Sequence, residues 1–238
     1  TNFSLLYGAM IRKQGKRLVQ DEEFKTYLYS ILGASFVIAI GLIITRNFEG
    51  FKSVELAFRD ALFQIVATMT TTGFCTSDYM SWHPILLLTI LLIIPMGATA
   101  GSTSGGIKII RLHIVAKNIF YEFKRVMHPK AIRPVRVNRR IVSENTLSNT
   151  YVFISIFVII TIASTIIMMF CGLSPNEALG CSLSSIANVG PSIGGFGPTG
   201  TYAALPDFAK WYLSVLMLIG RLELFTILIL FLPSFWRK

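Results

Sequence analysis

The sequence predicts an all-α integral membrane protein made of two similar units, and three observations lead to this fold class. First, 53% of the 238 residues are hydrophobic and only 14% are charged, with a mean hydropathy of +0.62, whereas a soluble domain has about 25% charged residues. Second, four long apolar stretches alternate with polar connections. Third, the order of elements in the first half recurs in the second.

The four apolar stretches are candidates for crossing a bilayer. A helix rises ~1.5 Å per residue and the hydrocarbon core is roughly 30 Å thick, so a crossing needs about 20 residues. Residues 27–45, 151–171 and 211–235 are long enough to cross as single helices. Residues 85–97 would cover only about 20 Å, so this span must continue through the sequence GATAGSTSGGIKII, residues 97–110.

Two shorter apolar segments, residues 54–70 and 176–187, are expected to be helices too short to cross. A shift of the chain by 117 positions places Gly73 on Gly190 and the tripeptide DAL on EAL within these segments. Residues 27–45 then fall on the approach to the third span and its first part. Each half is therefore predicted to be a span, a short helix, a glycine-containing loop and a span.

Basic residues cluster on alternate connections, which predicts the orientation in the membrane. The cytoplasmic side is expected to carry more Lys and Arg than the opposite side. The lead-in, the middle connection and the carboxyl end hold Arg12, Lys13, Lys16, Arg17, Lys25, Lys117, Lys124, Arg125, Lys130, Arg133, Arg136, Arg139, Arg140, Arg237 and Lys238. The two opposite connections hold chiefly Arg46, Lys52, Arg59 and Lys210. The lead-in, the middle connection and the carboxyl end are thus predicted to be cytoplasmic.

These patterns divide the chain into four parts. Residues 1–26 form a cytoplasmic lead-in, residues 27–116 the first unit, residues 117–146 a basic cytoplasmic connection, and residues 147–238 the second unit. The chain opens on Thr1 rather than Met, and we expect it to be a piece of a longer protein.

An intramembrane enzyme is the alternative from another class, and the sequence argues against it. Such an enzyme needs a nucleophile with its base, or metal ligands, at membrane depth. His83 lies at the edge of a span, and the other two histidines lie on the cytoplasmic side. Cys75, Cys171 and Cys181 have no metal-ligand or redox spacing. We therefore predict no catalytic residues and no covalent cofactor.

The sequences TTTGF, residues 70–74, and ANVGP, residues 187–191, follow the two short helices. Irregular backbone persists at membrane depth only when it is buried in protein or lines a water-filled cavity. Free carbonyls and the negative ends of helices both favour a cation. The predicted ion-binding residues are Thr70, Thr71, Thr72, Gly73, Ala187, Asn188, Val189 and Gly190. The alternative is a pair of tight loops between packed helices.

Residues 97–106 interrupt the second span with four glycines: Gly97, Gly101, Gly105 and Gly106. Glycine costs about 1 kcal/mol relative to alanine inside a helix, so the segment is expected to unwind. Its freed backbone groups need water or polar partners, which places it beside a pore. The alternative is a passive kink that lets helices pack closely.

Arg221 lies about ten residues into the predicted fourth span. A charge at that depth costs roughly 2.5 to 3.5 kcal/mol, so it should face a cavity or a partner. There it would repel cations or donate to the carbonyls of the unwound segment. Glu223 lies about 200° further round the helix, and we expect it to meet Lys108 or Arg111 on another helix. A structural ion pair without effect on ion flux is the alternative for both residues.

Three segments together resemble one known family over essentially the whole chain. These are the paired loops TTTGF and NVGP, the break GATAGSTSGGIKIIR at residues 97–111, and GRLELFTILILF at residues 220–231. They resemble the Trk-type members of the Trk/Ktr/HKT superfamily of potassium transporters. The resemblance implies that this chain holds the third and fourth of four repeats, and so half of a four-repeat, potassium-channel-like pore. It also implies potassium as the transported ion, filter carbonyls as its ligands, and residues 97–106 as a gate with Arg221.

The resemblance also implies partners and a location. It implies a bacterial inner membrane with its lipid, a homodimer, the remaining repeats of the same polypeptide, and a cytosolic nucleotide-binding regulatory ring. The ring would dock on residues 117–140, where eight Lys and Arg side chains exceed what topology requires; the alternative is a solvated loop. No nucleic acid is expected. The residues before each filter glycine, TT and NV, differ from the Thr-Val-Gly-Tyr-Gly of tetrameric potassium channels, so a sodium-permeable or sodium-coupled transporter is the alternative function.

Overall fold

The computed structural model describes residues 7–8, 11, 15–45, 51–128, 134–230 and 233–236. Several of the basic residues used to predict the orientation lie outside these ranges. They are Arg12, Lys13, Arg46, Lys130, Arg133, Arg237 and Lys238.

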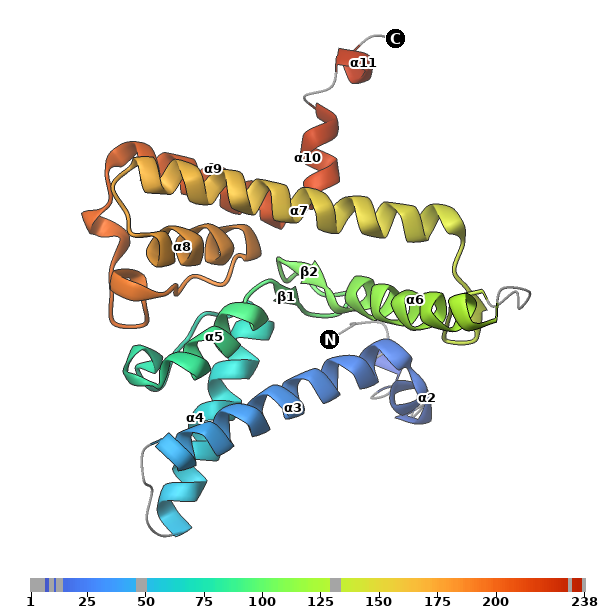
Figure 1. Cartoon of the computed structure of the whole chain (residues 1–238), viewed down its shortest axis with the longest axis horizontal. Helices are drawn as coiled ribbons and strands as arrows, with labels where there is room; N and C mark the ends of the chain where they lie inside the picture. Colours follow the sequence, from blue (N-terminus) through green and yellow to red (C-terminus); the bar gives the residue numbers. More distant parts are fainter. Residues whose placement is uncertain are drawn as a thin grey trace.

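The described residues are mostly helical, with two short strand pairs (Figure 1). The helices are α2 Gly15–Gln20, α3 Glu22–Thr45, α4 Phe51–Met69, α5 Pro84–Ile93, α6 Ile109–Met127, α7 Glu144–Phe170, α8 Pro175–Ala187, α9 Asp207–Arg221, α10 Leu224–Leu230 and α11 Pro233–Trp236. Strands β1 Met96–Gly97 and β2 Ile107–Lys108 pair in parallel. Strands β3 Arg136–Val137 and β4 Arg140–Ile141 pair antiparallel. Short 3-10 helices cover Tyr79–Ser81, Gly194–Phe196 and Tyr202–Ala204.

Two helices of the described chain, α3 and α7, have the length and composition needed to cross a membrane. Both begin earlier than the apolar pattern predicts, because polar residues start them. The Asp21 carboxylate accepts the backbone N–H of Phe24 at 2.8 Å, and the Ser143 hydroxyl accepts that of Thr146 at 3.3 Å. The predicted divisions after residues 26 and 146 therefore fall within α3 and α7, and the division after residue 116 falls within α6.

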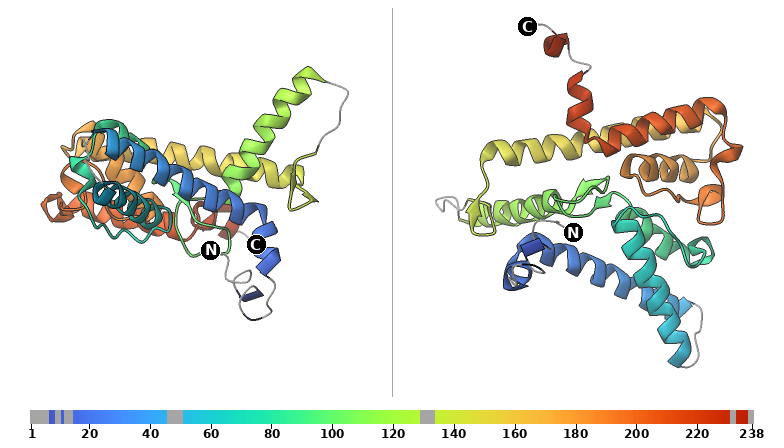
Figure 2. Two further views of the ribbon diagram at one scale, coloured as in Figure 1. Left: turned by 90° about the horizontal axis from the view of Figure 1, so that it is seen from below. Right: turned by 180° about the vertical axis from the view of Figure 1, so that it is seen from behind.

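The other two predicted spans are interrupted. The expected unwinding of the second span is confirmed, since α5 ends at Ile93 and α6 begins only at Ile109. The prediction of one continuous helix over residues 211–235 is wrong. Helix α9 ends at Arg221, and Glu223 adopts the left-handed conformation with φ 60° before α10 begins. Helix α10 consequently leaves α9 at a sharp angle (Figures 1 and 2).

Each half buries one short helix against its long helices. Helix α4 packs on α3, and α8 lies against both α7 and α9 (Figure 1). The first core includes Ile38, Leu42, Ile65, Met69, Tyr79 and Ile90. The second includes Phe153, Phe157, Met168, Ile186, Leu213 and Leu216. Ala187 and Val189, at the end of α8, belong to the first core. The end of α8 is therefore where the two halves meet.

The start of α8 is fixed by a capping box. The Ser174 side chain accepts from the third helical N–H, and the Glu177 carboxylate accepts the Ser174 backbone N–H. Glu177 Oε1 also accepts the backbone N–H of Gly195 at 3.1 Å. These hydrogen bonds, first from the Ser174 hydroxyl and then from Gly195, hold the pKa of Glu177 below its ordinary value.

The basic connection contains the β3–β4 strand pair, which the sequence did not predict. Asn138 and Arg139 form the turn of the β3–β4 hairpin with φ of 48° and 64°. The Asn138 side chain accepts the backbone N–H of Glu22 and donates to the carboxylate of Asp21, both at 2.8 Å. The hairpin thereby caps the start of α3.

Candidate functional site

The segments that follow α4 and α8 have the same backbone geometry. Thr71 and Asn188, which are 117 residues apart, are both left-handed with φ of 54° and 59°. Gly73 and Gly190, at the same spacing, have φ of 77° and 106°. Side chains are disfavoured in this region, which explains why glycine occupies the second pair of positions.

The hydrogen bonds of the two turns also correspond, residue for residue. In each turn, the left-handed residue and the residue after it donate their backbone N–H groups to carbonyls at the same relative positions of the preceding helix. The bonds are Thr71 N to Thr68 O, Thr72 N to Ala67 O, Asn188 N to Ser185 O and Val189 N to Ser184 O, all between 2.9 and 3.1 Å. A single conformation therefore ends both short helices.

The carbonyls predicted to bind an ion are without protein donors in this arrangement. Among hydrogen bonds that join described residues, none ends on the carbonyl oxygens of Thr70, Thr71, Thr72, Ala187, Asn188 or Val189. The next carbonyl, that of Gly190, accepts from Ser184 Oγ at 2.9 Å and from the Tyr202 hydroxyl at 2.8 Å. Carbonyls at a helix end carry partial negative charge, so those left unbonded can replace part of a cation's hydration shell.

The two turns contact each other directly. A Cβ placed on Gly73 would lie 2.2 Å from the carbonyl oxygen of Val189. The buried Tyr79, which follows the first turn, donates its hydroxyl to the Ser192 carbonyl at 2.6 Å. Gly73 and Gly190, which the sequence aligned with each other, thus lie in two turns that are in direct contact.

The glycine-rich loop, residues 95–108, returns on itself between α5 and α6 (Figure 1). The Ile107 N–H donates to Pro95 O at 2.8 Å, and the Ile109 N–H donates to Ala98 O at 3.1 Å. Gly106 has φ +69°, and a Cβ on Gly97 would lie 2.3 Å from the carbonyl oxygen of Gly105. Close backbone contact therefore requires glycine at these positions.

The glycine-rich loop touches the end of α8. A Cβ on Gly105 would lie 2.4 Å from the carbonyl oxygen of Ala187. From α9, a Cβ on Gly220 would lie 1.9 Å from the carbonyl oxygen of Ile186. Gly101, by contrast, is exposed. Gly220 is not among the predicted site residues. Glycine is needed there because α9 lies very close to the end of α8, and the sequence does not indicate that the two helices are neighbours.

Arg221 and Glu223 lie where α9 gives way to α10. Arg111 donates to the Glu223 carboxylate at 3.1 Å, which confirms one of the two predicted partners. Its guanidinium also lies 3.8 Å from the centre of the Phe153 ring. Arg221 is exposed, and no hydrogen bond among the described residues joins it to the glycine-rich loop. It lies close enough to Lys108 to interact electrostatically.

Two charged residues that the sequence did not single out as loop partners contact the glycine-rich loop. Lys108 Nζ donates to the carbonyl of Ser102 at 2.8 Å and to the carbonyl of Ser104. Glu23 Oε1, on α3, accepts the backbone N–H of Ala100 at 2.5 Å. Lys108 is 6% exposed and Glu23 is 8% exposed. The carbonyl contacts expected of Arg221 are therefore made by Lys108.

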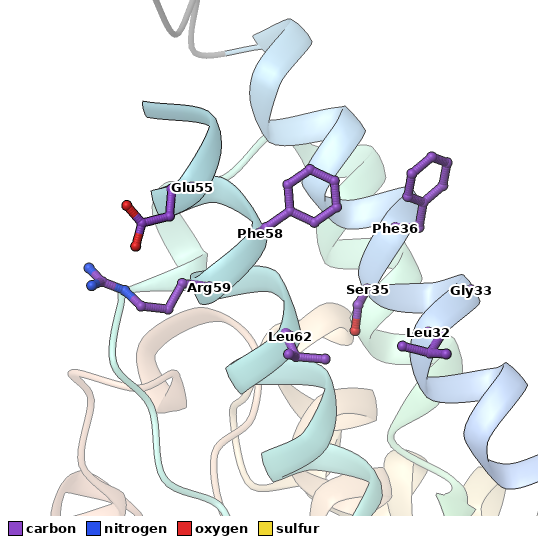
Figure 3. Close-up of a pocket in the computed structure, with 8 residues that line it drawn as sticks. All are labelled: Leu32, Gly33, Ser35, Phe36, Glu55, Phe58, Arg59 and Leu62. Carbon is purple, nitrogen blue, oxygen red and sulfur yellow. The ribbon is translucent and has the colours of Figure 1, made fainter. Parts of the chain in front are cut away.

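A groove between α3 and α4 lies apart from the turns and the loop (Figure 3). Its rings, Phe36 and Phe58, are 6.2 Å apart. Its lining is Leu32, Gly33, Ser35, Phe36, Glu55, Phe58, Arg59 and Leu62. This mainly apolar surface suits contact with acyl chains or another helix rather than with a hydrated ion.

Among the described residues, no group of three His, Cys, Asp or Glu side chains could hold a metal ion. Cys75, Cys171 and Cys181 are free. The turns and the loop instead offer backbone oxygens, which suit an alkali cation rather than a transition metal.

The chain is similar to known cation transport proteins. The family described as TrkH, cation transport protein, matches residues 1–238. The Trk system potassium uptake protein TrkH of Halomonas elongata is 30% identical over 237 residues, covering 100% of this chain and 48% of the relative. That of Escherichia coli K12 is 31% identical over 238 residues, covering 100% and 47%. These relatives are named as transport proteins and not as enzymes.

A solved structure has the same fold. The crystal structure of the potassium transporter TrkH from Vibrio parahaemolyticus superposes with a TM-score of 0.89 at 30% identity, covering 100% of this chain and 50% of that one. The chain thus spans about half the length of the curated relatives it matches.

Proposed function

Because this chain belongs to the TrkH family of cation transport proteins, we propose that it contributes half of the ion pathway of a membrane protein that takes up potassium. The observation that carries the proposal is the pair of turns after α4 and α8, whose matching geometry leaves carbonyls without protein donors. In this proposal the two units, residues 27–116 and 147–238, are the third and fourth of four repeats around one pore. Residues 1–26 and 117–146 are cytoplasmic.

The selectivity filter in this proposal is built from backbone oxygens. The carbonyls of Thr70, Thr71 and Thr72, with those of Ala187, Asn188 and Val189, form half of an ion-binding ring. Two observations support it: the left-handed residues that end both helices, and the close contact of Gly73 with the Val189 carbonyl. Carbonyl rings of this kind replace the hydration shell of potassium.

The glycine-rich loop is the gate in this proposal, and Arg221 adds an electrostatic barrier. The loop lies against the end of α8, with Gly105 at the Ala187 carbonyl. A segment in that position obstructs a pathway that passes between the two turns. Arg221, exposed at the end of α9, would repel a cation there.

The complete polypeptide, purified into liposomes, tests the transport proposal. We expect the liposomes to accumulate labelled rubidium. Unlabelled potassium should suppress this uptake at a far lower concentration than sodium does, because the carbonyl ring is matched to the larger ion. Empty liposomes give the background. Equal suppression by the two ions would favour the sodium-permeable alternative, and uptake at the background level would contradict transport.

A cytosolic nucleotide-binding ring is the proposed partner, within a homodimer in the bacterial inner membrane. The side chains of Arg136, Arg139 and Arg140 on the β3–β4 hairpin are exposed. Helix α6 beside it exposes Phe120 and Phe123, the latter 68% exposed. A surface of basic and aromatic side chains is typical of a protein interface.

Neutralising the hairpin is expected to weaken capture of the ring. The variant Arg136→Gln, Arg139→Asn, Arg140→Gln removes three charges, and asparagine tolerates the left-handed conformation at residue 139. Co-purification of the ring should fall, and most at low salt, where electrostatic attraction is least screened. Arg59→Gln, exposed on α4, is the matched control. Unchanged capture at both low and moderate salt would argue against docking on this surface.

A further inference from the structure

Two buried charged side chains hold the glycine-rich loop. One lies at the carboxyl end of the loop, and the other precedes the loop in the sequence by more than 70 residues. Lys108, at the end of the loop, reaches back to the carbonyls of Ser102 and Ser104. Glu23, in the first turn of α3, accepts the N–H of Ala100. The ammonium group of Lys108 therefore binds two carbonyls of the loop, and the carboxylate of Glu23 binds one of its N–H groups. Hydrogen bonds to charged groups are roughly twice as strong as neutral ones.

The residue next to Glu23 extends this contact to α6. The Glu22 carboxylate accepts from Lys117 Nζ at 2.5 Å and lies 3.4 Å from His113 Nε2. His113 Nδ1 is also hydrogen-bonded to the hydroxyl of Thr26 at 2.8 Å. Helix α6 starts directly after Lys108. The start of α3 thus holds both the loop and the helix that follows it.

We propose that Glu23 and Lys108 are positioning residues that hold the glycine-rich loop in its shut position, and that Glu22 couples this position to α6 through Lys117. The proposal rests on the gating role given to the loop above. A loop that moves away from α8 has to break the bonds from Lys108 and to Glu23. A displacement of α6 pulls on Glu22 and, through the shared first turn of α3, on Glu23.

Removing either charge is expected to favour the open loop. Lys108→Met keeps an unbranched side chain that is one atom shorter and removes the donors, and Glu23→Ala removes the acceptor. Each should raise rubidium uptake of the complete protein in liposomes by about tenfold, the size expected when a charged hydrogen bond is lost. Glu23→Gln, which retains a neutral acceptor, should give a smaller rise. The exposed Lys25→Met and Glu55→Gln are matched controls and should leave uptake unchanged.

A second measurement separates loop movement from general damage. Ala98 is 1% exposed, so a cysteine there, in a cysteine-free parent, should react slowly with a water-soluble thiol reagent. Lys108→Met and Glu23→Ala should both speed that reaction, and Lys117→Met should do so by less. In the double variant with Glu23→Ala, Lys117→Met should increase the labelling rate by less than it does alone, because Glu23 and Lys117 act through the same contact.

The outcomes distinguish this proposal from the transport proposal. If the parent takes up rubidium and neither Lys108→Met nor Glu23→Ala changes the labelling rate at residue 98, the two residues do not hold the loop. If Lys117→Met and Glu23→Ala are fully additive, the coupling to α6 is wrong. A parent protein that takes up no rubidium would instead contradict the transport function.

Discussion

Gly73→Ala in the complete protein is expected to abolish selective rubidium uptake. Gly73 has φ +77°, and its Cβ would lie 2.2 Å from the Val189 carbonyl oxygen and 3.2 Å from Pro191 Cδ. The left-handed conformation costs an alanine roughly 1–2 kcal/mol. The clash is with backbone, which no side-chain rotation relieves. The turn therefore has to move away from the second turn, and the proposed ring of carbonyls is lost.

Two other glycines are controls for this experiment. Gly190 has φ +106°, but a Cβ added there would meet no atom within 4 Å, so Gly190→Ala tests backbone strain without the clash and should cause a partial loss. Gly33, on α3, also has nothing within 4 Å and is helical, so Gly33→Ala should leave uptake unchanged. Uptake of rubidium and sodium is measured for protein that elutes as the parent does in gel filtration. A Gly73→Ala protein with the parental rubidium-to-sodium ratio would refute the filter assignment.

The turns could be predicted from sequence because their signal is local. A short apolar segment is followed within a few residues by a glycine, and the same order recurs 117 residues later. The left-handed Thr71 and Asn188 were not predicted. The ends of α4 and α8 accordingly fall within one residue of the predictions. The starts of α3 and α7 lie earlier than the apolar pattern predicts, since their first turns are polar and are capped by Asp21 and Ser143.

The contacts that fix the glycine-rich loop could not be predicted, because they join distant residues. Nothing near Glu23 in the sequence points to Ala100, which is 77 positions away. The break between α9 and α10 contains neither glycine nor proline, so the left-handed conformation of Glu223 could not be predicted either. The pairing of Glu223 with Arg111 was expected only because a charge at membrane depth needs a partner. An apolar pattern indicates which residues are buried in a helix, but it does not indicate which distant residues form hydrogen bonds with each other.

Gly105→Ala is expected to raise rubidium flux, which is the opposite direction to Gly73→Ala. Its Cβ would lie 2.4 Å from the carbonyl oxygen and 2.9 Å from the carbonyl carbon of Ala187. Overpacking of this kind costs typically 1–3 kcal/mol. If the loop is the mobile partner, it moves off the end of α8. At 1.4 kcal/mol per tenfold change, the open arrangement should be about tenfold more populated.

Arg221→Ala is expected to raise the flux as well, because it removes a positive charge from the proposed pathway. Combined with Gly105→Ala, it should give less than the product of the two increases if loop and charge form one barrier. Thr103→Ser, at an exposed position of the same loop, is the matched control. Rubidium uptake into liposomes by the complete protein measures all four variants. A gate that loses its contact with α8 or its positive charge must conduct more than before. An unchanged flux in both single variants would therefore mean that the loop is only a packing kink and that Arg221 is a structural residue.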